Sequence, residues 1–376
     1  MTQRQPTDPQ RAQVAHDRAA PELFLAPYRV LDLTDERGLL CGRVLADLGA
    51  DVVQVEPPQG SPARRVGPFA CGRPHPEGSL LWWFYAANKR GVTLDLATAD
   101  GRALFLRLVQ TAHFVVESFE PGFLDRLGLG WRVLRRANPA LVLVSITPFG
   151  QRGPRARWKA GDLVGMAAAG HLYLTGDPDR APVRVGYPQF YLHGAAAAAA
   201  GALVAHFWRK RTGRGQHVDV SCQQATARTL SSAVPAYTLE GSIIRRQGAY
   251  RQTSGTTFMR LTWPCKDGHV NFQLGGGMVG GRSTRNLIRW MADEGMAEPF
   301  LEEVPWESMD YGRLTRDLLD RVVPPMERWF LTHTKEELYR GAVERRILMF
   351  PVNAPADIEG EEQLAARRFW ESVAWD

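Results

Sequence analysis

The chain has 376 residues, which is more than a single hydrophobic core usually organises, so its length predicts two domains. Hydrophobic residues make up 44% of it and charged residues 23%, the proportions of a soluble globular protein. The formal net charge of +6 comes from basic residues that are scattered among acidic ones. That distribution favours a small phosphate-bearing ligand and argues against nucleic acid as a partner.

Cysteine spacing and apolar runs narrow the class of protein further. No C-x-x-C pair occurs among the four widely spaced cysteines, so we expect neither a disulfide framework nor a metal site. Residues 1 to 24 lack an apolar segment and predict a disordered tail rather than a secretory signal. The most apolar predicted helix, residues 195 to 208, is shorter than the about 20 residues that span a bilayer. We therefore expect a cytoplasmic protein with no membrane partner.

Strand-like and helix-like patterns alternate from Tyr28 onward. Residues 28 to 34 and 51 to 58 predict buried strands, and residues 38 to 50 between them predict a helix. Such a unit joins two parallel strands. Because the pattern recurs up to a strand at residues 217 to 221, we predict an α/β domain with a parallel sheet covered by helices on both faces. The first loop lacks the G-x-G-x-x-G spacing of dinucleotide-binding domains, which disfavours NAD as a ligand.

The stretch from Lys159 to Gln216 carries the residues that could do chemistry. It predicts a helix that begins near Asp162, a polar loop, a long alanine-rich helix and a closing glycine turn. Its small side chains and the cations at its ends suit close approach of the backbone to a large anionic ligand. From this stretch alone, a plain pair of buried helices is the alternative.

Six sequence blocks occur in order along the chain: RVLDLT, LADLGADVVQVEPP, NKRGVTLDL, VVESFEPGFLDRLGLGW, NPALVLVSITPFGQRGP and RTGRGQHVDVS. They resemble the class III CoA-transferases, the family of formyl-CoA and carnitine CoA-transferases and of α-methylacyl-CoA racemase. The resemblance is close over residues 28 to 235 and weaker over the rest of the chain. It implies coenzyme A, carried as an acyl-CoA, as the co-substrate and a carboxylic acid as the second substrate, with no metal.

The resemblance also implies where CoA binds. The family binds CoA on the large domain through main chain after a basic turn, through an E-N-F-x-P-G loop and through scattered cations. The matching positions here are Asn88, Lys89, Leu94, Asp95, Ser118, Phe119, Arg126 and Lys159. We expect Arg126 and Lys159 at the CoA phosphates, because a multiply charged anion needs compensating cations. For Arg126, the alternative is an ion pair on the surface of a helix.

The chain departs from the family at the position of the nucleophile. In the transferases, an aspartate just before the small-residue helix attacks the acyl thioester and forms a mixed anhydride. Counting back from TGRGQ, this position holds Tyr191, and the other registers offer Gln189 or His193 but no carboxylate. The pKa of a tyrosine is about 10, so the phenol is largely protonated at neutral pH and cannot simply replace the aspartate.

Two other residues of the stretch from Lys159 to Gln216 are further candidates for a catalytic role. Asp162 is the nearest carboxylate that the motif retains, and capping of its helix is the alternative. His193 is a candidate base or orienting group, and an ordinary structural role is the alternative. The racemase branch relies on a His-Asp pair, and Gly161 replaces its histidine here, which leaves too few proton-transfer groups for a racemase or isomerase.

Beyond about residue 231 the pattern of strands and helices changes, and domain boundaries are expected there. The resemblance implies an intertwined dimer and a chain that extends further than Asp376. We expect a large CoA-binding domain over residues 25 to 230, a linker over 231 to 252, a smaller α+β domain over 253 to 335 and a segment over 336 to 376 that returns to the large domain.

Two functions fit these features. One is a CoA-transferase subunit that binds acyl-CoA, lacks the nucleophile and forms a heteromer with a homologue that supplies the aspartate. The other is a self-sufficient CoA-transferase, as a homodimer, with a non-standard active site.

Overall fold

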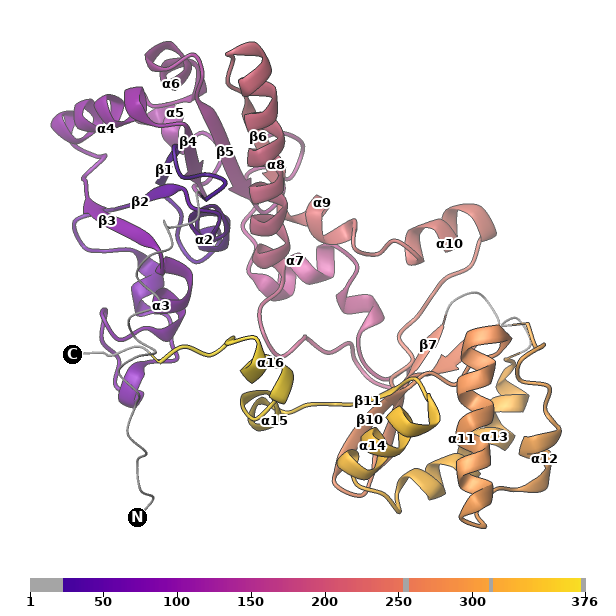
Figure 1. Cartoon of the computed structure of the whole chain (residues 1–376). Helices are drawn as coiled ribbons and strands as arrows, with labels where there is room; N and C mark the ends of the chain where they lie inside the picture. Colours follow the sequence, from indigo (N-terminus) through magenta and orange to yellow (C-terminus); the bar gives the residue numbers. More distant parts are fainter. Residues whose placement is uncertain (1–22, 253–256, 311–313, 373–376) are drawn as a thin grey trace, which may run out of the picture. The chain divides into compact units, whose positions relative to one another are not determined.

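The computed structural model describes residues 23 to 252, 257 to 310 and 314 to 372 (Figure 1). The tail predicted over residues 1 to 24 lies outside the described residues except for Leu23 and Phe24.

Contacts divide the chain into two compact units. Of the described residues, 23 to 171 and 185 to 229 belong to the first unit. Residues 172 to 184 and the described residues between 230 and 372 belong to the second.

A six-stranded parallel sheet forms the centre of the first unit. Its strands lie in the order β3 (Lys89–Thr93), β2 (Asp51–Glu56), β1 (Arg29–Asp32), β4 (Phe114–Glu117), β5 (Val142–Thr147) and β6 (His217–Ser221). Each neighbouring pair runs parallel. Every residue of β4 and β5 is buried, as expected for strands that are covered on two faces. The predicted α/β class is confirmed.

Helices flank this sheet because side chains along each strand alternate between two apolar clusters. Val30 and Phe114 pack in one cluster, with side chains of α2 (Leu39–Asp47) and α8 (Phe190–Thr212). Leu31 and Val115, the next residues on the same strands, pack in the other cluster with α4 (Ala99–Thr111) and α6 (Trp131–Ala137). The remaining helical segments of this unit are η1 (Pro62–Arg65), η2 (Ala70–Gly72), α3 (Leu80–Ala86), α5 (Phe123–Arg126), α7 (Asp162–Ala168) and α9 (Cys222–Ala227).

The helix α8 is longer than the sequence predicts: it extends beyond residues 195 to 208 at both ends. Its buried alanines, among them Ala198 and Ala202, let its backbone approach α2 and β5. It ends at Gly213, whose φ of 68° is the left-handed conformation that favours glycine. Among the described helices, α8 is the one long and apolar enough to cross a membrane, and 44% of its apolar window is buried. Its packing against α2, α9 and β5 is that of a core helix.

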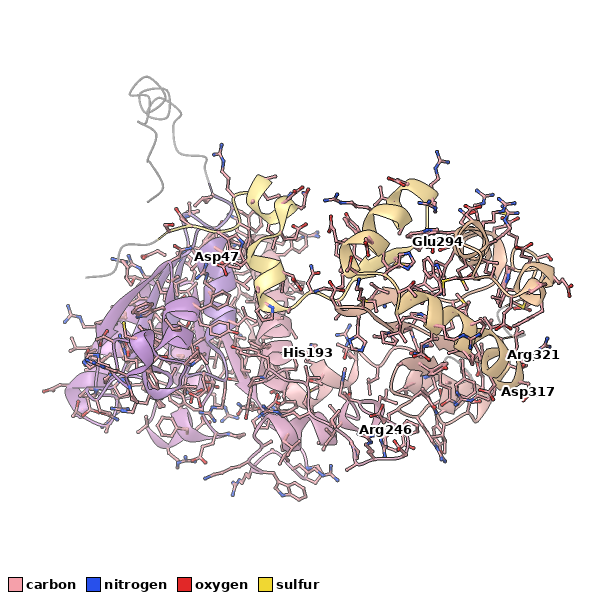
Figure 2. The ribbon with its side chains drawn as sticks, turned by 90° about the horizontal axis from the view of Figure 1, so that it is seen from below. Asp47, His193, Arg246, Glu294, Asp317 and Arg321 are labelled. Atoms are coloured by element: carbon pink, nitrogen blue, oxygen red, sulfur yellow. The ribbon has the colours of Figure 1, made fainter. Side chains whose placement is uncertain are left out.

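The second unit combines helices with small antiparallel sheets. The strands β9 (Thr262–Cys265), β10 (Gly268–Phe272) and β11 (Met349–Pro351) form one sheet, and β7 (Tyr250–Gln252) pairs with β8 (Phe258–Arg260). Aliphatic and aromatic side chains form its core together, and Glu294 (Figure 2) accepts hydrogen bonds from the indole N–H groups of Trp290 and Trp329, at 2.7 and 2.6 Å. The helical segments are η3 (Leu172–Leu174), α10 (Ala233–Glu240), η4 (Gly277–Gly281), α11 (Arg282–Asp293), α12 (Pro299–Glu303), α13 (Arg316–Phe330), α14 (Lys335–Arg345), α15 (Pro355–Glu359) and α16 (Glu362–Ala366).

The unit boundaries differ in three places from the domain scheme expected from the sequence. Residues 336 to 376, expected to return to the large domain, group with the second unit, because β11 pairs with β10. Residues 172 to 184, inside the expected large domain, also group with the second unit. The expected linker over 231 to 252 contains α10 and β7. Of the expected small domain, residues 253 to 256 and 311 to 313 lie outside the described residues.

Candidate active site

Two cavities open where the strands of the parallel sheet end. The Leu94 cavity, of about 420 Å³, is lined by residues that follow β1, β2, β3 and β4, with Leu94 among them. The Tyr191 cavity, of about 880 Å³, is lined by residues from the β1 and β4 loops, the α7 region and the start of α8. Asp35, Phe119 and Phe123 line both. Because open α/β sheets bind ligands beyond the carboxyl ends of their strands, the two cavities together are the candidate site.

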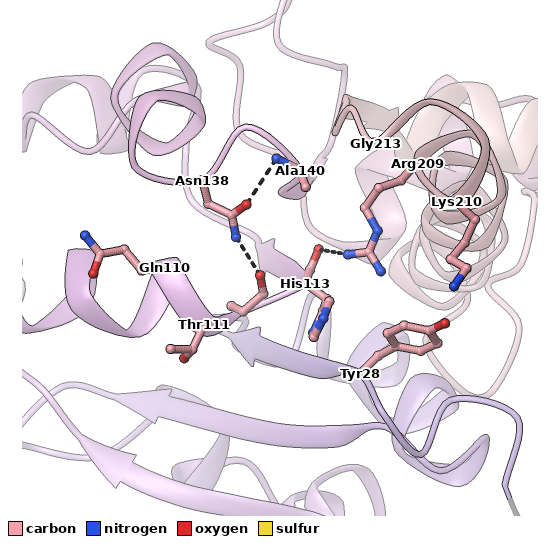
Figure 3. A pocket seen from close by; sticks show the side chains of 10 residues that line it. Tyr28, Gln110, Thr111, His113, Asn138, Ala140, Arg209, Lys210 and Gly213 are labelled. Carbon is pink, nitrogen blue, oxygen red and sulfur yellow. Dashed lines mark hydrogen bonds between the residues drawn. The ribbon is translucent and has the colours of Figure 1, made fainter.

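A third cavity, of about 440 Å³, lies at the other end of the strands, where their amino ends meet (Figure 3). Its lining residues Tyr28, His113 and Ala140 come just before β1, β4 and β5. Arg209 lines this cavity, but its guanidinium already bonds to protein groups. Nη1 donates to the His113 carbonyl oxygen at 3.2 Å, and Nη2 lies 2.8 Å from His206 Nδ1. None of the site residues predicted from the sequence lines this cavity.

Tyr191, in the first turn of α8, lines the cavity that bears its name. Its hydroxyl donates a hydrogen bond of 2.7 Å to the main-chain oxygen of Ala160. Burial raises the pKa of this phenol above its usual range, and the opposing effect of the Arg37 guanidinium does not cancel the rise. Tyr191 is therefore a neutral hydrogen-bond donor at physiological pH, which makes it a poor nucleophile.

Asp162 begins α7 and caps the start of α8. Its Oδ1 accepts hydrogen bonds from the main-chain N–H groups of Gln189 and Phe190, at 2.6 and 2.9 Å. The sequence suggested a cap on Asp162's own helix, whereas the fold uses the carboxylate on a helix 27 residues further along the chain. The second oxygen, Oδ2, is buried with no hydrogen-bond partner among the described residues. Asp162 lines the Tyr191 cavity, so one of its oxygens is structural and the other is uncommitted.

His193 (Figure 2) is not among the described residues that line the Tyr191 cavity. Its ring stacks on that of His171, with centroids 5.8 Å apart and an interplanar angle of 27°. Burial, with a smaller contribution from His193, lowers the pKa of His171 below its usual value. The structure therefore brings Tyr191 and Asp162 to one cavity and places His193 beside another histidine.

Lys89 is buried and its ammonium is already paired. The side chain is 1% exposed and forms an ion pair of 2.8 Å with Asp32, which is 0% exposed. It also donates to the Leu39 carbonyl oxygen at 3.0 Å and to Gln54 Oε1 at 3.2 Å. Asn88, which precedes it, is exposed and donates to Asp47 at 2.8 Å. Neither residue lines either cavity, so the structure brings no group of this turn to the candidate site, and the expected CoA contact there stays a prediction.

The other predicted main-chain positions gather at the two cavities. Leu94 and Asp95 line the Leu94 cavity, and Phe119 lines both cavities. Ser118 is buried beneath them, where its hydroxyl donates to Asp35 Oδ1 at 3.0 Å and accepts from the Asp35 main-chain N–H at 3.1 Å. Ser118 therefore ties the loop after β4 to the loop after β1.

The two cations expected at the phosphates lie in different settings. Lys159 is exposed, lines the Tyr191 cavity and forms no ion pair with the described residues. Arg126 lies on α5, pairs with the exposed Glu120 and places its guanidinium 5.7 Å from the centre of the Phe123 ring. Lys159 is thus a free cation at the cavity, whereas Arg126 is shared with a carboxylate near it.

The loop that follows β1 supplies site residues that the sequence did not single out. Arg37 lines the Tyr191 cavity and is clamped by Asp35, whose carboxylate accepts from Nε at 2.8 and 3.0 Å and from Nη2 at 2.5 Å. Burial alone would lower the pKa of Arg37, but the bond to Asp35 outweighs it and the net pKa is raised. No described residue bonds to Nη1, which leaves one edge of the guanidinium for a ligand. The sequence signal that could have identified Arg37 is its position just after the first strand, because ligands bind beyond the carboxyl ends of such strands.

Glu36 is the carboxylate of the Tyr191 cavity that has no fixed partner. It lines the cavity and forms no ion pair or hydrogen bond with another described side chain. By contrast, Asp35 holds Arg37, Glu120 holds Arg126 and Asp162 caps α8. Burial, and then the charge of Asp35, raises the pKa of Glu36 above its usual value.

Comparison with known proteins decides the family. Residues 25–375 match the family model described as CoA-transferase family III. This chain belongs to CoA-transferase family III. It is 38% identical over 349 residues to the succinyl-CoA:(R)-benzylsuccinate CoA-transferase subunit BbsE of Thauera aromatica. The aligned region covers 92% of this chain and 82% of that protein.

Two further similarities agree with that match. The alpha subunit of succinyl-CoA–L-malate CoA-transferase from Chloroflexus aurantiacus is 31% identical over 350 residues, with 92% of this chain and 78% of that protein covered. A crystal structure of a CaiB/BaiF family protein from Brucella suis superposes with a TM-score of 0.76 at 26% identity, covering 92% of this chain and 88% of that one. The family resemblance is confirmed, and the assignment of Tyr191 to the family's nucleophile position stays a prediction. No group of three or more His, Cys, Asp or Glu side chains in the described part of the chain could hold a metal ion.

Proposed function

We propose that this member of CoA-transferase family III binds acyl-CoA in the joined Leu94 and Tyr191 cavities and takes part in CoA transfer as the subunit that does not supply the nucleophile. One observation carries the proposal: the group at the expected nucleophile position, Tyr191, is a neutral phenol that donates to the Ala160 carbonyl oxygen. The names of two relatives, which are subunits of CoA-transferases, support it.

The shape and chemistry of the cavities suit the two ends of an acyl-CoA. The Leu94 cavity is lined by apolar side chains such as Leu33, Val55 and Leu96, which suit the flat face of the adenine. In our proposal one CoA phosphate binds Lys159, which lines the Tyr191 cavity, and a second binds Arg126, whose guanidinium lies beside the Phe123 ring. The pantetheine arm then passes Phe119 and Phe123 into the Tyr191 cavity.

The Tyr191 cavity suits an acyl group that combines an apolar part with a polar end. Leu81 and Leu192 supply apolar surface, and the hydroxyls of Tyr85 and Tyr187 lie 3.4 Å apart. The free edge of Arg37 is suited to an acyl carbonyl oxygen or to a carboxylate.

The missing step is the attack on the thioester. In the family's reaction a carboxylate attacks the acyl carbonyl, expels the CoA thiolate and forms a mixed anhydride. The thiolate then attacks the enzyme's own carbonyl of that anhydride, which leaves CoA on the enzyme as a thioester and releases the donor acid as a carboxylate. A protonated phenol does not start this cycle, and one oxygen of Asp162 is committed to the start of α8. In our proposal a homologous subunit supplies the aspartate within an intertwined, cytoplasmic heteromer.

A CoA-exchange assay tests this function. The chain alone should bind succinyl-CoA without exchanging its CoA with benzylsuccinate or malate, acids chosen from the names of its relatives. Added together with a homologue that carries an aspartate at the position of Tyr191, it should support exchange. Full exchange by the chain alone, or no CoA binding at all, would refute the proposal.

A self-sufficient transferase with a non-standard site is the second candidate, and Glu36 favours it. A carboxylate that lines the cavity and has no fixed partner is a possible nucleophile. Incubation with succinyl-CoA, hydroxylamine trapping and peptide mass analysis separate the two candidates. An adduct on the peptide that contains Glu36, lost in Glu36→Gln, would establish the second.

A further inference from the structure

Glu117 is a buried carboxylate that supports both cavities without lining either. It is the last residue of β4 and is 4% exposed. Its Oε2 accepts a hydrogen bond of 2.7 Å from the main-chain N–H of Phe119. A carboxylate that accepts a main-chain N–H two residues ahead fixes the direction in which the loop leaves the strand.

Phe119 forms, with Phe123, the wall that the two cavities share. Both rings line the Leu94 cavity and the Tyr191 cavity. They stack with centroids 4.5 Å apart and an interplanar angle of 29°. A shift of the Phe119 backbone therefore changes both cavities at once, at the place where a ligand that spans them must pass.

We propose that Glu117 is a positioning residue whose ionised carboxylate holds the Phe119–Phe123 wall in the form that binds CoA, so that CoA binding tightens as the pH rises through neutrality. An ionised acceptor makes a shorter and stronger hydrogen bond than a neutral one. When Glu117 takes up a proton, its hold on the Phe119 N–H weakens and the wall loosens. This inference rests on the proposed binding of CoA in the two cavities.

The surroundings of Glu117 bring its pKa close to neutrality, so the carboxyl group changes its charge near physiological pH. Burial raises its pKa to about 7, and the hydrogen bonds from Ser145 and the Phe119 N–H and the charge of Arg37 oppose that rise, while Asp219 adds to it. Ser145 and Asp219 are the register partners on β5 and β6. The charged groups that face Glu117 are thus Arg37, from the loop after β1, and Asp219.

A histidine on β6, two residues before Asp219, provides the control. His217 Nε2 lies 2.9 Å from the Ser145 hydroxyl, so its own protonation could also reach Glu117. Burial lowers the pKa of His217 below its usual value. If His217 were the source of a pH effect, removing its imidazole would abolish the effect while Glu117 remained.

Calorimetric titration of the full chain tests the inference, with coenzyme A and with dephospho-CoA, which lacks the 3′-phosphate that itself titrates near neutral pH. Between pH 6 and pH 8 the wild type should gain about fivefold to tenfold in affinity for dephospho-CoA, the difference between a neutral and an ionised hydrogen-bond acceptor. Glu117→Gln should bind with nearly the same affinity at both pH values. His217→Gln should retain the pH dependence of the wild type.

The outcomes separate the inference from the proposed function. If the wild type binds neither ligand at any pH, the proposed function fails. If it binds both but shows no pH dependence, or if Glu117→Gln keeps that dependence, the positioning role alone is refuted. If Glu117→Gln does not fold, Phe119→Leu replaces it: loss of the ring should weaken binding at every pH, and unchanged binding would overturn the inference.

Discussion

Lys89 and Lys159 belong to the same predicted set of CoA-binding residues, but they lie in opposite environments. Lys89 is 1% exposed and paired with a fully buried aspartate, Asp32, between β1 and β3. Lys159 is exposed at the rim of the Tyr191 cavity and has no ion-pair partner among the described residues. A family motif thus locates a loop, whereas burial decides whether the cation of that loop stabilises the fold or stays available to a ligand.

Breaking the buried pair should have the largest effect. Lys89→Met leaves Asp32 buried without a counter-charge, which we expect to cost about 3 to 5 kcal/mol of unfolding free energy. Denaturant unfolding measures this cost. The double variant Lys89→Met with Asp32→Asn, in which neither charge remains, should recover part of the loss. A single variant that is destabilised by less than about 1 kcal/mol would contradict this account of the pair.

The buried carboxylate of Glu117, unlike the paired charges of Lys89 and Asp32, should make the folded protein less stable as the pH rises. The pKa of Glu117 is raised in the folded state from 4.5 to about 7, so between these values the folded state holds the proton more tightly than the unfolded state. Stability should therefore fall as the pH rises through that window, by about 3 kcal/mol in total. Unfolding at pH 5 and pH 8 measures the fall, and Glu117→Gln should lack this component. An equal fall in the variant would assign it to other groups.

Removing the exposed cation should change binding and leave the fold intact. Lys159→Ala should weaken CoA binding by about 1.5 to 3 kcal/mol, with a smaller salt dependence than the wild type, because a charge-assisted contact to phosphate is lost. Its unfolding free energy should stay within about 0.5 kcal/mol of the wild type. Lys210→Ala, at the third cavity, is the matched control and should bind CoA normally. Unchanged binding in Lys159→Ala would remove this lysine from the site.

The smallest effect is expected at Arg126, which stands between the two extremes. Its ion pair with Glu120 is exposed on both sides, at 57% and 59%, so Arg126→Ala should change stability by less than about 1 kcal/mol. Because Glu120 shares the guanidinium, we expect the loss in CoA affinity to be about 1 kcal/mol, less than for Lys159→Ala. Calorimetry on both variants under identical conditions gives the order. A larger loss for Arg126→Ala would reverse the assignment of the main phosphate contact.

The parallel sheet was predictable because its signal is local. Buried runs such as residues 142 to 147, joined by helices of ordinary length, indicate parallel strands wherever they occur. The family blocks also placed Leu94, Asp95 and Phe119, which the structure brings to the two cavities. These features depend on the order of residues along the chain and on little else.

Features that depend on distant partners were not predictable in the same way. Lys89 is buried because β1 brings Asp32 to it from 57 residues away, and Asp162 caps α8 because α7 and α8 begin side by side. The strand β11 has three residues, too few for a periodic pattern, so its pairing with β10 could not be read from the sequence. Glu117 looked like one more residue of a motif, and its role depends on a hydrogen bond to Phe119.

Intact-protein mass measurement after incubation with succinyl-CoA tests the central claim most directly: that this chain binds acyl-CoA but supplies no nucleophile. With binding shown to be saturable, the wild-type mass should not change, and the peptide with residues 187 to 193 should be unmodified. Tyr191→Asp should gain a hydroxylamine-sensitive adduct on that peptide. A covalent acyl or CoA adduct on the wild-type chain, formed as fast as CoA exchange, would contradict the claim.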